Sequence, residues 1–306
     1  MVRHLISIDD LTDEELFSVV CRGALFADGG HGRPLAGRVA GIYFTKTSTR
    51  TRTAFSVGAQ RLGASVVSYG AEDLQTNTGE SVADTGRVLS SMLDLLVARA
   101  PGEPELLRGW AGQSAMAVVN AMSTEEHPTQ ALADLTTLLR HFGRIESLRV
   151  LYVGEGNNTA TALALALSRF TGVELFLRTP PGYGLPAEIA ERTMARAKKY
   201  GAVVEERHDM VDLPTGVDVV YTTRWQTTGT VKPDQDWRAV FTPFRVDLSL
   251  WAGSPNAVFM HDLPAHRGEE VAAEVLDGPA SIAFFQAENK LYSAMAVLDW
   301  ANGGPR

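Results

Sequence analysis

Short apolar runs alternate with amphipathic stretches along most of the chain. Four runs in the first half have the length and composition of buried strands: residues 39–44, 65–69, 95–98 and 117–120. Three stretches with apolar positions every three or four residues predict helices: residues 54–62, 81–93 and 128–142. Gly63 and Gly143 follow two of these helices, where a glycine commonly ends a helix. Strands that alternate with helices predict a parallel sheet.

The second half shows the same alternation. Its expected strands are residues 148–153, 173–177, 203–204 and 217–221, and its expected helices end near residues 170 and 200. We therefore expect an α/β protein of two doubly wound domains, each with a mainly parallel sheet flanked by helices. The first domain is expected to span residues 1–142 and the second 143–280, with a C-terminal helix at 281–303 that packs back on the first.

Composition narrows the class of protein. The 306 residues carry a formal net charge of -8, which argues against a nucleic-acid partner because binding to the phosphate backbone needs a basic face. The single cysteine, Cys21, excludes an intramolecular disulfide. The sequence has neither a signal-type apolar segment nor a run of about 18 apolar residues that could cross a membrane. We expect a cytoplasmic enzyme.

A turn of hydroxyl-bearing and cationic residues follows the first apolar run: Ser48, Thr49, Arg50, Thr51 and Arg52. The first turn of a helix leaves backbone N–H groups unpaired and carries the positive end of the helix dipole. Ser48 can cap the helix while Arg50 reaches the same anion. The pattern therefore predicts a phosphate site, and a solvated surface turn is the alternative.

Four further segments carry candidate chemistry. Arg99 ends a predicted strand opposite the cationic turn, and His127 and Gln130 flank a helix start, from which both can direct hydrogen bonds into one space. The glycine turn at residues 154–158 follows a buried strand, as a dinucleotide-binding turn does. The stretch 261–270 combines two histidines with several carboxylates, a combination that suits a metal.

Together these segments resemble the aspartate/ornithine carbamoyltransferase family, and its ornithine branch more closely. The matching segments follow one another through the chain: residues 44–52, 79–85, 98–99, 127–135, 153–158, 263–271 and 287–289. The resemblance implies a first domain that binds carbamoyl phosphate, a second that binds an amine acceptor, and a homotrimer with shared active sites. The reaction requires no metal or redox cofactor.

By position, the resemblance also implies roles for single residues. Those expected to bind carbamoyl phosphate are Ser48, Thr49, Arg50, Thr51, Gln75, Arg99, His127, Gln130, Leu263 and Lys290. Those expected to bind the acceptor are Asn158, Thr223, Arg224, Gln226, Thr227, Thr228 and Asp262. The catalytic set is Arg99, His127, Gln130 and Asp262. Gln75 matches a residue that reaches the site of a neighbouring subunit, and Arg52 is expected only in a structural ion pair.

The chemistry of these residue types agrees with this assignment. An amine that attacks the carbamoyl carbon builds negative charge on the carbonyl oxygen and then on the leaving phosphate. Fixed donors aimed at both oxygens lower the barrier. Arg99, His127 and Thr51 can serve the carbonyl oxygen, and the helix N-terminus with Arg50 can serve the phosphate.

The acceptor side departs from the ornithine pattern. Thr223 stands where the ornithine enzymes have an aspartate, and Thr227 and Thr228 replace a serine–methionine pair. Asp262 replaces a cysteine. Removing a carboxylate that pairs with a buried cation costs about 3–5 kcal/mol. Ornithine should therefore bind poorly.

We accordingly expect a carbamoyltransferase for a small amino acid or amine that is ornithine-like but not ornithine, such as a shorter diamino acid. An ornithine carbamoyltransferase that makes citrulline is the alternative. Arg224 and Gln226 match residues that hold aspartate in the aspartate enzymes, and Asn158 matches one that binds the amino-acid end of ornithine. Asp262 has two interpretations: it accepts an N–H from the amine or acts as its base, or it is paired with Arg224 and inert. Lys290 stands where the family has arginine and loses the bidentate fork, so donor affinity should be weaker.

Other classes fit less well. An NAD(P)-dependent oxidoreductase built on residues 154–158 lacks the third glycine, whose place Thr159 takes, and the next strand lacks an acidic ribose ligand at its end. A zinc hydrolase built on His261, Asp262 and His266 is disfavoured because an intervening proline breaks helical spacing. A catalytically inactive family member that binds an amino acid or a partner protein is the last alternative.

Overall fold

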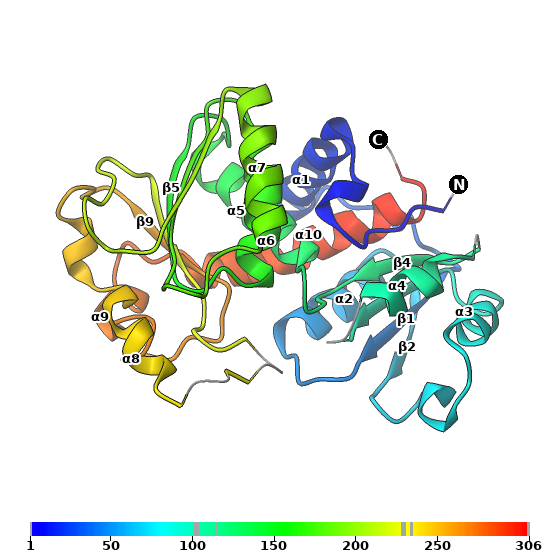
Figure 1. Ribbon diagram of the computed structural model, residues 1–306. Helices are drawn as coiled ribbons and strands as arrows, with labels where there is room; N and C mark the ends of the chain where they lie inside the picture. The colour runs from blue at the N-terminus through cyan, green and yellow to red at the C-terminus, as the bar shows by residue number, and fades with distance from the viewer. Residues whose placement is uncertain (1, 101–103, 114, 228–230, 233–234, 305–306) are drawn as a thin grey trace. The chain divides into compact units, whose positions relative to one another are not determined.

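The chain forms two compact units, coloured from blue to red along the sequence in Figure 1. Unit 1 comprises Met1–Arg140 and Glu288–Arg306, and unit 2 comprises His141–Ala287. The computed structural model describes residues 2–100, 104–113, 115–227, 231–232 and 235–304. Within these ranges no helix is both long enough and apolar enough to cross a lipid bilayer.

Unit 1 is built on a four-stranded parallel sheet in the order β2-β1-β3-β4. The strands are β1 (Val39–Phe44), β2 (Ser65–Tyr69), β3 (Leu95–Arg99) and β4 (Ala117–Asn120). The helices are α1 (Asp13–Ala27), α2 (Arg50–Arg61), α3 (Val82–Ser90), α4 (Pro104–Ala111), most of α5 (Pro128–Phe142) and most of α10 (Ala283–Ala301), with 3-10 turns η1 (Ile8–Asp10) and η2 (Gln75–Thr78). Strands β3 and β4 are buried throughout, which explains their continuous apolar runs.

Unit 2 is built on a five-stranded parallel sheet in the order β7-β6-β5-β8-β9. The strands are β5 (Arg149–Val153), β6 (Glu174–Arg178), β7 (Val203–Arg207), β8 (Val219–Thr222) and β9 (Val258–His261). The helices are α6 (Asn158–Leu167), α7 (Ala187–Tyr200), α8 (Trp237–Phe241) and α9 (Ala273–Leu276), with 3-10 turns η3 (Thr242–Phe244) and η4 (Leu248–Trp251). Helices α6 and α7 lie side by side against the sheet (Figure 1). Helix α9 packs its buried side chains into the core formed by β5, β8 and β9.

The expected fold class of two mainly parallel α/β sheets is confirmed, with local corrections. Helix α6 ends at Leu167 rather than near residue 170, because the chain turns at residues 168–171 ahead of Gly172, whose φ is 70°. Helices α4, α8 and α9 and strand β9 were not predicted.

Both sheets reverse their strand order at one point. In unit 1 the reversal lies between β1 and β3, and in unit 2 between β5 and β8. Ligands of doubly wound sheets bind beyond the carboxyl ends of the strands at such a point. The cationic turn follows β1 and Arg99 ends β3, whereas the glycine turn follows β5 and Thr223 follows β8. The fold therefore brings the candidate residues of each unit to its switch point.

A buried carboxylate connects the N-terminal segment of unit 1 to the loop between β4 and α5. Glu126 accepts hydrogen bonds from the Ser7 hydroxyl at 2.6 Å and from the Ile8 N–H at 2.7 Å. Burial raises the pKa of Glu126 to about 7, because the carboxylate loses its hydration, even though these two donors oppose the shift. The ionised form is therefore costly in the folded state near neutral pH.

Substitution of Glu126 by Gln should reveal this cost. The folded-state pKa of about 7 lies above the ordinary value of 4.5. The carboxyl group therefore stabilises the fold fully below pH 4.5, and this contribution is lost as the pH rises through 7. At about 1.4 kcal/mol per unit of pKa shift, the unfolding free energy of the wild type should fall by about 3 kcal/mol relative to E126Q between about pH 4.5 and pH 8. Urea titrations at a fixed protein concentration measure the difference. E188Q, which removes an exposed carboxylate of α7, is the control, and parallel pH profiles for wild type and E126Q would contradict the prediction.

Candidate functional site

The cationic turn begins α2 without a side-chain cap. The helix starts at Arg50, and Thr49 occupies the N-cap position with helical backbone angles (φ -78°, ψ -60°). Ser48 was expected to cap, and this expectation is wrong: its hydroxyl instead accepts a hydrogen bond from Arg99 Nη1 at 3.2 Å. A capping side chain needs an extended backbone at the N-cap, which Thr49 does not have. With no side-chain cap, the N-terminus of α2 is suited to bind an anion.

A small pocket in unit 1 brings together side chains from α2, the start of α5 and α10. It is lined by Thr51, Ala54, Phe55, His127, Thr129, Gln130, Lys290 and Ala294. Four of these belong to the expected donor site, namely Thr51, His127, Gln130 and Lys290, and all four are buried. Residues far apart in the sequence therefore present polar groups to one small space.

His127 is uncharged at neutral pH. Burial lowers the pKa of its imidazole well below the usual value, and the positive charges of Lys290 and Arg99 lower it further. Its Nδ1 lies 3.4 Å from the Thr129 hydroxyl. A neutral imidazole can donate one hydrogen bond to a ligand oxygen without adding charge to the site.

Gln130 has its side-chain amide fixed by a residue that sequence reasoning missed. Its Nε2 donates to Asp134 Oδ1 at 2.7 Å, one helical turn further along α5. Its Oε1 is buried and has no hydrogen-bond partner among the described residues. A buried acceptor without a partner is costly, so this oxygen is suited to receive an N–H from a ligand. The i,i+4 spacing of glutamine and aspartate was the available signal.

Two other expected donor-site residues, and the expected ion pair of Arg52, are not found at this pocket. Gln75 is exposed on η2 and does not line the pocket. Leu263 belongs to unit 2, where its φ is 54°. Arg52 is exposed, and it forms no ion pair with the part of the chain that the structure describes, so the expectation of a structural ion pair is wrong. The exposed position on α2 lets water solvate its guanidinium.

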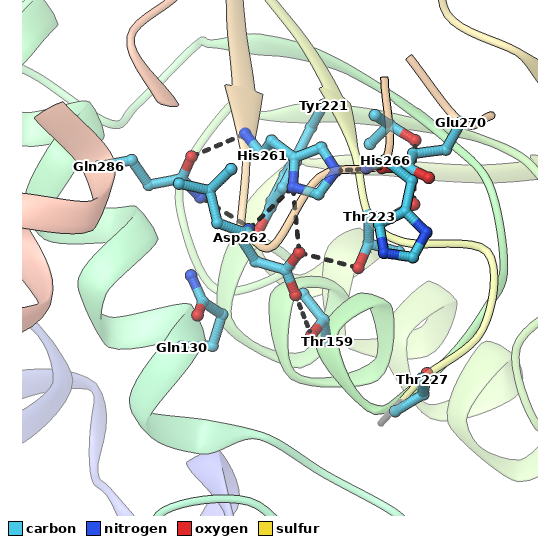
Figure 2. Close-up of polar contacts among 12 residues, drawn as sticks. Gln130, Thr159, Tyr221, Thr223, Thr227, His261, Asp262, His266, Glu270 and Gln286 are labelled. Atoms are coloured by element: carbon cyan, nitrogen blue, oxygen red, sulfur yellow. Dashed lines mark hydrogen bonds and ion pairs between the residues drawn. The ribbon is translucent and has the colours of Figure 1, made fainter. Parts of the chain in front are cut away.

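Asp262 lies at the centre of a polar network in unit 2, shown in Figure 2. The Thr159 hydroxyl from α6 donates to its Oδ2 at 3.0 Å, and the Thr223 hydroxyl beyond β8 donates to its Oδ1 at 2.9 Å. The side chain of Asp262 keeps 15% of its surface exposed. Each carboxylate oxygen has lone pairs beyond these bonds, so the group can still accept hydrogen from a ligand.

Asp262 is not paired with Arg224, so the interpretation of an inert ion pair is wrong. The partners of the Asp262 carboxylate are hydroxyl groups, and Arg224 forms no ion pair with any described residue. The Nε of Arg224 is buried without a hydrogen-bond partner in the described ranges. Unit 2 therefore offers a fixed carboxylate and a guanidinium that the described residues do not neutralise.

His261 supports the network through both of its ring nitrogens. Its Nδ1 accepts the Leu263 N–H at 2.8 Å, so Nε2 carries the proton and donates to Glu270 at 3.2 Å (Figure 2). The contact of 3.5 Å between Nδ1 and Asp262 therefore has no hydrogen to share. Both ring nitrogens are occupied, which argues against the metal trio His261, Asp262 and His266. Within the described ranges, the side chains spaced closely enough to hold a metal are instead His266, Glu269 and Glu270.

The glycine turn has a structural explanation. A Cβ on Gly156 would lie 2.3 Å from the carbonyl carbon of Gly184, so close packing of two backbone segments requires glycine there. Asn157 caps α6, and its Nδ2 donates to the Thr227 hydroxyl at 3.0 Å. The turn therefore needs no dinucleotide to account for its glycine. Asn158 is buried at the start of α6 and Gln226 is half-buried, whereas Thr228 lies outside the described residues.

The tautomer of His261 can be tested directly. Selective 15N labelling of histidine should give an unprotonated Nδ1 and a protonated Nε2 for His261 at about pH 8, because the Leu263 N–H occupies Nδ1. The H261Q variant assigns the signals. A doubly protonated ring or the opposite tautomer would mean that His261 pairs with Asp262 instead of leaving that carboxylate free.

Comparisons with known proteins give matches along nearly the whole chain. The family model for the aspartate/ornithine carbamoyltransferase carbamoyl-P binding domain matches residues 3–140, and that for the Asp/Orn binding domain matches residues 146–301. Ornithine carbamoyltransferase from Symbiobacterium thermophilum is 41% identical over 97% of this chain and 96% of its own length. The ornithine carbamoyltransferase from Thermococcus kodakarensis is 37% identical over 99% of this chain and 97% of its own length.

Solved structures extend the likeness to three dimensions. Ornithine carbamoyltransferase from Pyrococcus furiosus superposes with a TM-score of 0.92 at 36% identity, covering 99% of this chain and 98% of its own. The anabolic ornithine carbamoyltransferase from Campylobacter jejuni superposes with a TM-score of 0.90 at 30% identity, covering 98% of this chain and 99% of its own. With both family models matched in order and relatives similar over their whole length, the chain belongs to the aspartate/ornithine carbamoyltransferase family.

Proposed function

We propose that the protein transfers the carbamoyl group of carbamoyl phosphate to the distal amino group of ornithine, or of a diamino acid close to it, and releases phosphate. The observation that carries the proposal is the position of Asp262. Its carboxylate lies 2.9 Å from the hydroxyl of Thr223, the residue at which a lost carboxylate argued against ornithine. The negative charge needed for the acceptor is therefore available from the next strand. The names of the relatives favour ornithine over a shorter acceptor.

The acceptor side fits a molecule with charges of both signs. Asp262 would hold the distal amino group through the free lone pairs of its carboxylate. Arg224, which forms no ion pair with the described residues, would hold the α-carboxylate, and Asn158 would bind the amino-acid end. A simple diamine offers no carboxylate to Arg224, and aspartate brings a second carboxylate towards Asp262. Both should be poorer acceptors than ornithine.

The donor side would be formed by unit 1. The N-terminus of α2 with Ser48, Thr49 and Arg50 would bind the phosphate, since backbone N–H groups and a guanidinium favour an anion. The neutral imidazole of His127 would donate to the carbonyl oxygen. The unpaired Oε1 of Gln130 would accept from the carbamoyl NH2 group. These contacts hold the carbamoyl group with its carbon open to attack.

Three more side chains would stabilise the negative charge that develops during the reaction: the hydroxyl of Thr51 and the cations of Arg99 and Lys290. The reacting amine must be uncharged, so its lone pair attacks the carbamoyl carbon, the bond from that carbon to the phosphate oxygen breaks, and the proton that the nitrogen then loses passes to the leaving phosphate. Negative charge passes from the carbonyl oxygen to the phosphate, and the fixed donors stabilise both.

We also propose a homotrimer in which Gln75, exposed on η2, reaches the donor site of a neighbouring subunit, as the family resemblance implies.

A panel of acceptors tests the proposal. Phosphate release from carbamoyl phosphate is measured with ornithine, 2,4-diaminobutyrate, 2,3-diaminopropionate, lysine, putrescine and aspartate. Ornithine should give the highest kcat/KM, because it alone combines the α-carboxylate with a distal amine at the family's usual reach. Preference for a shorter diamino acid by about tenfold or more, which is about 1.4 kcal/mol, would replace ornithine as the acceptor. Binding of carbamoyl phosphate without transfer to any amine would overturn the proposed function.

Exchanging the carboxylate between the two strand ends tests the role of Asp262. D262C should lower kcat/KM for ornithine by about 100-fold or more, because the acceptor cation loses its buried partner. T223D alone places a second carboxylate against the first and should also lower activity through like-charge repulsion. The double variant T223D/D262C restores a single carboxylate and should recover most of the activity. Wild-type kinetics in D262C would show that this carboxylate does not bind the acceptor.

A further inference from the structure

Lys232 is enclosed in unit 2 by one carboxylate and three aromatic rings. Its Nζ lies 2.5 Å from Glu155 Oε1 and 4.4 Å, 4.5 Å and 5.4 Å from the ring centroids of Tyr183, Phe241 and Trp237. Only 3% of the lysine side chain is exposed. A lysine is rarely this buried unless it is paired, and an ammonium over aromatic faces gains cation–π attraction.

Glu155, the partner of Lys232, belongs to the turn that leads into α6. The carbonyl oxygen of Glu155 accepts a hydrogen bond from the Tyr152 hydroxyl at 2.6 Å, which fixes the turn against β5. Burial raises the pKa of the Glu155 carboxyl group, and Lys232 opposes that shift. The second carboxylate oxygen is buried and has no hydrogen-bond partner among the described residues. Removal of Lys232 would therefore leave a buried charge with little compensation.

Besides the hydrogen bond from Thr223 to Asp262, other contacts attach the described part of the acceptor-side segment, residues 223–227 and 231–232, to its surroundings. Near its start, Trp225 packs on Phe241 of the aromatic cluster, with ring centroids 5.7 Å apart. In its middle, the Thr227 hydroxyl accepts a hydrogen bond from Asn157. At its end, Lys232 enters the same aromatic cluster and pairs with the glycine turn. The contact of Lys232 with Glu155 is ionic.

This segment and this turn carry the proposed acceptor ligands. Thr223 and Arg224 lie at the start of the segment, and Asn158 directly follows the turn. We propose that Lys232 is a positioning residue for the acceptor: its ammonium, held by Glu155 within the aromatic rings, fixes the segment against the start of α6. The inference rests on the proposed function, since it concerns the acceptor of that reaction.

Two variants separate positioning from charge balance. K232M keeps an apolar stem in the aromatic cluster but removes the ammonium, so the KM for the acceptor should rise by about tenfold or more, while the KM for carbamoyl phosphate changes less than about twofold. E155Q/K232M removes both charges. It should recover thermal stability, because no buried charge is left unpaired, yet keep the raised acceptor KM, because the contact is still absent.

Two further variants complete the set. K232R retains a cation and should keep an acceptor KM close to that of the wild type. K199M is the matched control, because Lys199 also lies over an aromatic ring, that of Tyr200 at 4.9 Å, but it is exposed near the end of α7. It should change neither KM.

Hydrogen exchange gives a readout that does not depend on turnover. Peptides that cover residues 222–232 and 150–158 should exchange faster in K232M and in E155Q/K232M than in the wild type or in K199M. If the wild type carbamoylates no amine, the proposed function fails while this measurement still tests the contact. Where K232M does not fold, the double variant supplies both measurements.

Two outcomes would overturn the inference. One is recovery of acceptor KM together with stability in E155Q/K232M, which would show that Lys232 only neutralises Glu155. The other is unchanged acceptor KM and unchanged exchange in the folded lysine variants.

Discussion

In a parallel sheet all strands end at the same edge, and this constraint places the candidate chemistry of each unit. In unit 1 it brings the turn after β1 next to Arg99 at the end of β3, where the guanidinium donates to Ser48. In unit 2 it brings Thr223 after β8 next to Asp262 after β9, close enough for a hydrogen bond. The side chains involved are distant in sequence. They meet because the crossover connections are long and the strand ends are adjacent.

Burial at these edges decides which groups carry charge. His127 is held uncharged by burial and by neighbouring cations, so it can act as a hydrogen-bond donor without attracting protons from solvent. Its neighbour in the chain, Glu126, is buried among donors and has a raised pKa, although it points to the N-terminal segment instead of the pocket. Burial is the main cause of both shifts, and it favours the neutral form of each adjacent residue: it raises the pKa of the carboxyl group and lowers the pKa of the imidazole.

The sequence predicted the layout well and the contacts less well. Apolar runs and glycine positions predicted most strands and helices, because buried parallel strands and helix ends leave local signals. The pairing of Asp262 could not be predicted in the same way. Whether its carboxylate meets Arg224 or the hydroxyl of Thr223 depends on how three separate strand and helix ends pack, and no spacing along the chain encodes that. The cap at Ser48 was wrong for a related reason, since the Arg99 guanidinium competes for the same hydroxyl.

The position of one carboxylate decides how strongly the altered acceptor residues argue against ornithine. Neighbouring strands lie about 4.8 Å apart, so a charge moved from the end of β8 to the end of β9 would be displaced by several bond lengths if both side chains pointed straight out. The hydrogen bond between Thr223 and Asp262 closes most of that gap and holds the carboxylate beside position 223. The site therefore keeps its negative charge. The remaining shift in the position of that charge is comparable to the length of one or two methylene groups. The combination of Thr223 with Asp262 can therefore change which acceptor chain length fits the site, more than which acceptor charge fits it.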